Sequence, residues 1–228
     1  MLYAVLRSAL WVFTRLICRY RVGGREHVPP QGPLLIVANH LSWYDPLLLG
    51  VVLPRRLWFF TKVEMFRWPI VGLGCRLTGQ IPVHRGESDR AALEKGLTYL
   101  HEGKVLMVFP EGTVARQEQM IAAHMGAALL AIRSGVPVLP IAHSGTRRVL
   151  RSPRYWFPRV DIKIGKPYTP ALPESGSRKA QLQVVMEDMM TRIAAMLPEE
   201  NRGVYVDSNT FGRAKKQALA GDIDLYKE

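Results

Sequence analysis

The segment PLLIVANHLSWYDP, residues 33–46, decides the fold that this sequence predicts. Its first part, residues 33–38, is a short apolar run, which is typical of a strand buried on both faces. Its last residue opens a second apolar stretch, 46–53, which suits a helix because proline is favoured at the first helical position. A buried strand that leads through a polar loop into a helix is the repeating unit of parallel α/β sheets.

The rest of the chain repeats this alternation. Helical spacing predicts helices at 65–73, 88–101, 120–134 and 178–197, the second of them with Ser88 as its N-cap. Apolar runs predict strands at 57–61, 79–83, 104–109 and 136–142, and an alternating pattern predicts a half-exposed strand at 160–164. We therefore expect an α/β domain over residues 23–202, in which helices flank a largely parallel central sheet. Residues 203–228 are a polar tail to which we assign no fold.

Residues 1–22 are predicted to form a separate amphipathic helix. On a helix, Arg7, Arg15 and Arg19 share one stripe with Trp11, while apolar side chains cover most of the remaining surface. Three arginines argue against a membrane-spanning helix, and the segment lacks the charge order of a secretory signal. Two alternatives remain. The composition favours a membrane-associating helix that lies in the interface, and the other is a helix packed on the protein's own core.

The composition excludes several classes of protein. The chain has 228 residues, of which 48% are hydrophobic and 22% are charged, so it can bury a full core and is not disordered. Cys18 and Cys75 lie far apart without metal-ligand spacing, which predicts no metal site and favours a reducing compartment. The formal net charge of +12 predicts attraction to polyanions, which include nucleic acid and anionic lipid headgroups.

The loop after the first strand brings a histidine and a carboxylate together. Loops at the carboxyl ends of strands are the usual ligand-binding positions of α/β sheets. Asp45 can accept a hydrogen bond from one imidazole nitrogen of His40, which makes the other nitrogen a better base toward an alcohol. The alternative is that Asp45 only caps the following helix and that His40 is a polar residue at a strand end.

Three further strand-to-loop transitions occur, and their loops can face the same crevice. Val108 leads into Glu111, Gly112 and Thr113, where a glycine can leave amide hydrogens free for an anion or oxyanion. The strand at 79–83 leads to Arg85, which suits phosphate. The strand at 136–142 leads into the polar residues 143–146.

Four sequence blocks, in this order and spacing, resemble those of the glycerolipid acyltransferases of the 1-acylglycerol-3-phosphate acyltransferase type. They are N-H-x4-D at 39–45, G-x-I-P-V-x-R at 79–85, F-P-E-G-T at 109–113 and V-P-V-x-P-I at 136–141. The resemblance covers residues 22–166. It implies an enzyme of phospholipid biosynthesis that moves a fatty acyl group from acyl-CoA or acyl-carrier protein, its co-substrate, to a hydroxyl of a lysophospholipid.

The resemblance also implies roles for individual residues. His40 would be the general base that Asp45 orients, and no acyl-enzyme and no cofactor would be needed. Arg85 would hold the phosphate of an acceptor such as 1-acylglycerol-3-phosphate, and residues 111–113 would complete the acceptor site. Lys62-Val63-Glu64 and Pro69 resemble an element that shapes the acyl pocket, although a surface ion pair explains the first of these equally well.

One departure from the family pattern concerns the acceptor. The third block usually continues with an arginine that contributes to phosphate binding, and this chain has Val114 there. A lysine that often follows is also replaced, near Ala123 and His124. Either Arg116 reaches into the site, or the acceptor is a different lipid or a glycolipid. A non-catalytic lipid-binding protein of the same fold is a further alternative.

A second basic region supports a membrane partner. Tyr155, Trp156 and Phe157 lie among seven basic residues, and such mixtures suit anionic bilayers; a solvated surface loop with a packed tryptophan is the alternative. The basic residues are Arg147, Arg148, Arg151, Arg154, Arg159, Lys163 and Lys166. No nucleic-acid recognition motif accompanies them, so we predict an anionic membrane surface as partner and no nucleic acid. The expected location is the cytoplasmic face of a membrane, as a peripheral or monotopic protein. No oligomeric state is predicted.

Overall fold

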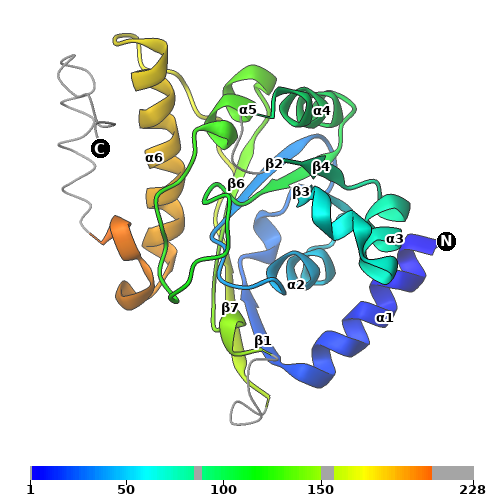
Figure 1. Ribbon diagram of the computed structural model, residues 1–228. Coiled ribbons are helices and arrows are strands. Elements are labelled where there is room, and N and C mark those ends of the chain that lie inside the picture. Colours follow the sequence, from blue (N-terminus) through cyan, green and yellow to red (C-terminus); the bar gives the residue numbers. More distant parts are fainter. Residues whose placement is uncertain (1, 85–88, 150–156, 207–228) are drawn as a thin grey trace.

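The centre of the fold is a seven-stranded sheet in the order β1-β7-β6-β2-β5-β3-β4. The structure is a computed structural model that describes residues 2–84, 89–149 and 157–206 (Figure 1). The strands of this described part are β1 (Arg19–Gly23), β2 (Leu34–Ala38), β3 (Leu57–Lys62), β4 (Ile81–Val83), β5 (Val105–Val108), β6 (Val138–Ser144) and β7 (Arg159–Ile164). Neighbouring strands pair in parallel except β6 and β7, which are antiparallel. The prediction of a largely parallel sheet is thus confirmed.

Helices cover both faces of this sheet, because the side chains of its central strands alternate between two apolar clusters. Leu35 and Val37 of β2 face a cluster that includes residues of α4, α5 and α6. Leu34 and Ile36 face a second cluster that includes residues of α2. The helices are α1 (Leu2–Ile17), α2 (Asp45–Val52), α3 (Pro69–Thr78), α4 (Arg90–His101), α5 (Gly126–Ser134) and α6 (Arg178–Met196). Burial on both faces explains why β2 reads as a continuous apolar run.

The register of the central strands places their ends at one edge of the sheet. Val37 of β2 lies opposite Val108 of β5 and Pro140 of β6. The loop that follows β2 therefore lies close to the loop that follows β5 and to the end of β6. The candidate site residues were predicted in loops at this edge, where the parallel strands end.

Three predicted elements differ in the structure. Residues 120–125, predicted as the start of a helix, are irregular, since the N–H groups of Met120 and His124 donate to the carbonyls of Asn201 and Pro110 instead. Residues 19–22, predicted as the end of a helix, belong instead to β1, so the boundary drawn after residue 22 falls inside a strand. The fold also extends past 202, because Val204 N–H donates to Met120 O.

Two helix starts also differ from the sequence prediction. Asp89 is the N-cap of α4, and its side chain accepts from Ala92 N–H; Ser88 lies outside the described residues. The helix predicted at 65–73 is interrupted, because a 3-10 turn at Val63–Arg67 ends before Pro69 begins α3. Each helix thus starts within a few residues of the predicted position, at a residue suited to a helix start: Asp89 as the N-cap of α4 and Pro69 as the first residue of α3.

The N-terminal helix α1 has a packed side and an exposed side. Arg7 Nη2 donates to the carbonyl of Leu53 at 2.8 Å, at the end of α2, and Thr14 is fully buried. Among residues 7–17 of α1, the large exposed apolar side chains are Trp11, Val12, Phe13 and Leu16. The packed side fits the alternative of a helix packed on the protein's own core, and membrane association of the exposed side stays a prediction. Among the described residues, no helix has the length and apolar character needed to cross a membrane.

Candidate functional site

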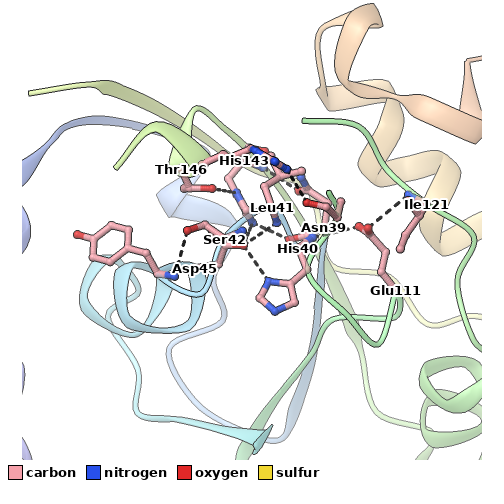
Figure 2. A network of polar contacts seen from close by, with 12 residues as sticks. Asn39, His40, Leu41, Ser42, Asp45, Glu111, Ile121, His143 and Thr146 are labelled. Carbon is pink, nitrogen blue, oxygen red and sulfur yellow. Dashed lines mark hydrogen bonds and ion pairs between the residues drawn. The ribbon is translucent and has the colours of Figure 1, made fainter. Parts of the chain in front are cut away.

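The loop between β2 and α2 folds around the carboxylate of Asp45. Its Oδ2 accepts hydrogen bonds from Leu41 N at 2.7 Å, from Ser42 N at 2.8 Å and from the ring Nδ1 of His40 at 2.9 Å (Figure 2). Asp45 is the first residue of α2, and the preceding Tyr44 makes no side-chain cap. The idea that Asp45 caps the helix is therefore wrong, because its carboxylate turns back toward the loop.

His40 is held in one orientation and one tautomer. Only 5% of the residue is exposed, and its ring stacks on Phe109 with the centroids 4.1 Å apart. Because a carboxylate only accepts hydrogen bonds, the Nδ1 that faces Asp45 carries the hydrogen. The Nε2 atom is then left with its lone pair, as a general base requires.

A second histidine lies beside the same carboxylate. His143 is buried at the end of β6, and its Nε2 donates to the carbonyl of Asn39 at 2.6 Å and lies 3.6 Å from Asp45 Oδ2. Asn39 in turn exchanges side-chain hydrogen bonds with the main chain of His143, at 2.9 and 3.0 Å. His143 was not predicted as a site residue, although its position in a largely apolar strand indicates burial.

The surroundings of Asp45 and His143 lower the pKa of both side chains. Burial raises the pKa of Asp45, but the charge interaction with His143 and the hydrogen bond from His40 outweigh burial and hold that pKa below its ordinary value. Burial lowers the pKa of His143. A charged Asp45 would stabilise an imidazolium at His40, as general-base catalysis requires.

Glu111 connects the loop after β5 to the β2–α2 loop that contains His40. Its Oε1 accepts from the main-chain N–H of His40 at 3.0 Å, and its Oε2 accepts from Ile121 N–H at 3.3 Å. Ala115 N–H also donates to the carbonyl of His40, at 2.9 Å. Burial raises the pKa of Glu111 to about 7. The side chain predicted for the acceptor site thus points at the main chain, and its contact with substrate stays a prediction.

The other predicted residues of this block lie nearer the surface. Gly112 has a φ of 65°, and a Cβ there would lie 2.8 Å from the ring of His124, so only glycine fits. Its N–H donates to Phe109 O and is not free for an oxyanion, contrary to our expectation. Thr113 and Arg116 are exposed.

The remaining candidate residues lie elsewhere. Arg85 lies outside the described residues, so its phosphate contact stays a prediction. Lys62 Nζ and Glu64 Oε1 form an ion pair at 3.1 Å, as the surface alternative expected, and a role in the acyl pocket stays a prediction. Among the residues that the structure describes, no group of three or more His, Cys, Asp or Glu side chains could hold a metal ion.

Comparison with known proteins assigns the family. A family model described as Acyltransferase matches residues 19–144, which is more than half of the chain. The chain belongs to the acyltransferase family. Lyso-ornithine lipid O-acyltransferase of Pseudomonas aeruginosa is 36% identical over 146 residues, 62% of this chain and 55% of that protein. Human 1-acyl-sn-glycerol-3-phosphate acyltransferase alpha is 36% identical over 129 residues, 55% of this chain and 46% of that protein.

This acyltransferase-family chain thus spans about half the length of these two curated relatives. The crystal structure of the 1-acyl-sn-glycerophosphate acyltransferase PlsC of Thermotoga maritima matches with a TM-score of 0.64, over 85% of this chain and 81% of that chain. The sequence identity is 24%, so this match shows the shared fold. The α/β architecture of the acyltransferase domain is thus confirmed by an independent structure.

The raised pKa of Glu111 predicts a pH-dependent stability for this family member. The pKa of Glu111 is 4.5 for the free side chain and about 7 in the fold. At a pH between these two values, Glu111 is mostly protonated in the folded protein and mostly ionised in the unfolded chain. The free energy of unfolding should therefore fall by up to about 3 kcal/mol as the pH rises through this window. Urea unfolding at about pH 5 and about pH 8 measures the change.

Glu111→Gln should remove that part of the pH dependence, because its amide does not titrate. Glu118→Gln, at a half-buried residue ion-paired with Arg148, is the matched control and should keep the wild-type dependence. Equal pH dependence in Glu111→Gln and the wild type would contradict a proton held at Glu111.

Proposed function

We propose that the protein transfers a fatty acyl group from a thioester, acyl-CoA or acyl-carrier protein, to a hydroxyl of a lysophospholipid such as 1-acylglycerol-3-phosphate. The observation that carries this proposal is the buried Asp45 carboxylate on Nδ1 of His40, which leaves Nε2 as a base. The names of the relatives, which include a lyso-ornithine lipid acyltransferase and 1-acyl-sn-glycerol-3-phosphate acyltransferases, support the reaction class.

In the proposed reaction, the acceptor hydroxyl gives its proton to His40 Nε2 while its oxygen attacks the thioester carbonyl. The tetrahedral intermediate then expels the thiolate, which takes the proton back from the imidazolium and leaves as a free thiol. An ester bond forms, a thioester bond breaks, and His40 returns to its neutral form.

The two cysteines support direct transfer without an acyl-enzyme. Cys18 and Cys75 are both buried, and burial raises the pKa of each thiol. A thiol with a raised pKa carries little of the thiolate that would attack an ester. The hydroxyl of the acceptor is therefore the nucleophile that this site favours.

A second candidate acceptor is a lipid with a different headgroup. The absence of an arginine at Val114 and the likeness to a lyso-ornithine lipid acyltransferase favour it. Mass spectrometry of the lipids formed from a mixed pool of acceptors and acyl-CoAs tests both candidates. No thiol release with any acceptor would instead favour a non-catalytic lipid-binding protein.

We also propose that the protein works on an anionic membrane, at its cytoplasmic face. Exposed apolar side chains support this: Leu16 of α1 is 71% exposed, and Ile70 of α3 is 87% exposed. Leu73 and Leu77 follow Ile70 at helical spacing and are also exposed, at 55% and 49%. Figure 1 shows α1 and α3 together on the right of the view. Side chains of this kind insert into the interface of a bilayer.

The double substitution Leu16→Ser with Ile70→Ser should weaken binding to anionic vesicles about tenfold or more, because two apolar side chains no longer insert. Flotation with vesicles that contain phosphatidylglycerol measures binding. Val204→Ser is the control, since Val204 is 62% exposed but lies in the 3-10 turn Gly203–Tyr205, drawn orange on the other side of Figure 1. Equal losses for both variants would contradict this membrane face.

A further inference from the structure

Arg147 reaches from the end of β6 to the loop that contacts the catalytic histidine. Its Nη1 donates to the carbonyl of Ala115 at 2.9 Å. The N–H of the same Ala115 donates to the carbonyl of His40 at 2.9 Å. Ala115 therefore connects the guanidinium of Arg147 to the main chain of His40, although Arg147 and His40 lie far apart in the sequence.

A tight turn holds Arg147 in this place. Gly145 has a φ of 83°, and a Cβ there would lie 2.3 Å from the carbonyl oxygen of Arg159, so the turn requires glycine. The next residue, Thr146, is fully buried, and its hydroxyl lies 3.4 Å from Nδ1 of His143. The 3-10 turn Thr146–Arg148 is therefore anchored in the network that holds the catalytic loop (Figure 2).

The charge of Arg147 is not balanced within the described residues. It is half-buried, and the hydrogen bond to Ala115 uses one of its five N–H donors on a neutral carbonyl. Its neighbour Arg148 is exposed and pairs with Glu118 at 3.4 Å. The adjacent loop offers no cation at Thr113 or Val114, and the carboxylate of Glu111 faces main-chain N–H groups. A held guanidinium with free donors suits a phosphate or a carboxylate, which it can bind with two parallel hydrogen bonds.

We propose that Arg147 binds the anionic headgroup of the lipid acceptor while His40 takes the proton of its hydroxyl. This assignment rests on the proposed acyltransferase function and names the group that selects the acceptor. Arg147 would place a positive charge beside the loop in which Val114 supplies none. The phosphate of 1-acylglycerol-3-phosphate and the carboxylate of lyso-ornithine lipid share the required chemistry.

The test compares Arg147→Gln with Arg148→Gln in the full chain. Arg147→Gln should raise the KM for an anionic acceptor about tenfold or more, because a charge-assisted hydrogen bond is lost, while the KM for acyl-CoA stays within about twofold. Arg148→Gln should match the wild type in both constants. Arg147→Lys should recover part of the loss, since it keeps the charge but not the paired geometry.

Three acceptors separate the possible outcomes: 1-acylglycerol-3-phosphate, lyso-ornithine lipid and uncharged monoacylglycerol. A raised KM for either lipid that carries an anionic group, the phosphate of the first or the carboxylate of the second, supports the assignment and identifies the headgroup. A KM unchanged for both, or an equal rise for monoacylglycerol and for acyl-CoA, overturns it and leaves the acyltransferase proposal standing. Failure of the wild type to transfer an acyl group to any of the three overturns the proposed function, and this assignment with it.

Discussion

Replacing His40 by alanine is expected to lower kcat for acyl transfer by at least about 10²–10⁴-fold, because the general base is removed. The KM values should change little, since the side chain acts on the proton in transfer. The main chain of residue 40 should stay in place, because Glu111 and Ala115 hold it through its N–H and carbonyl. Release of free thiol, measured together with formation of the acylated lipid, gives the rate.

The control for this substitution is His101→Ala. His101 is exposed at the end of α4 and should be replaceable without loss of activity. Thermal unfolding of both variants would separate a catalytic loss from a folding defect. Wild-type activity in folded His40→Ala would refute the role that we give to His40.

Asp45→Asn should lower kcat by about 10²–10⁴-fold and leave stability close to that of the wild type. All three hydrogen bonds at Asp45 end on one oxygen, Oδ2, and the amide oxygen of asparagine can accept them in the same place. The substitution therefore removes the negative charge that stabilises the His40 imidazolium and keeps the geometry of the loop.

Asp45→Ala is the informative comparison. It removes the charge and also leaves the N–H groups of Leu41 and Ser42 without a partner, which costs about 1–3 kcal/mol for each buried donor. It should therefore lose both activity and stability, as urea unfolding would show. If Asp45→Asn kept the wild-type kcat while Asp45→Ala unfolded, the carboxylate would only hold the loop and would not assist His40.

The contact between His40 and Asp45 could be predicted from the sequence because its geometry is local. Only four residues separate His40 from Asp45, and a buried strand before them and a proline after them leave one short loop in which the two can meet. The sheet could also be predicted from the sequence, because central strands that are buried on both faces appear as apolar runs. These features depend on neighbours in the chain.

The partners of Glu111 and His143 could not be predicted, because contacts between distant segments decide them. Glu111 lies in a block that suggests substrate contact, yet its carboxylate ends on N–H groups of residues 40 and 121. His143 meets Asn39 only because β2 and β6 are neighbours in the sheet. Strand β1 was missed for the same reason, since its pairing partner β7 is remote in the sequence.

In the proposed mechanism, a hydroxyl attacks the thioester directly with His40 as its base, while donor and acceptor occupy the site together. Initial rates measured while acyl-CoA and the lipid acceptor are both varied distinguish this mechanism from one with an acyl-enzyme. Direct transfer predicts intersecting lines in double-reciprocal plots, because both substrates must be bound before any bond changes. Parallel lines, which indicate an acyl-enzyme formed before the acceptor binds, would rule out direct transfer.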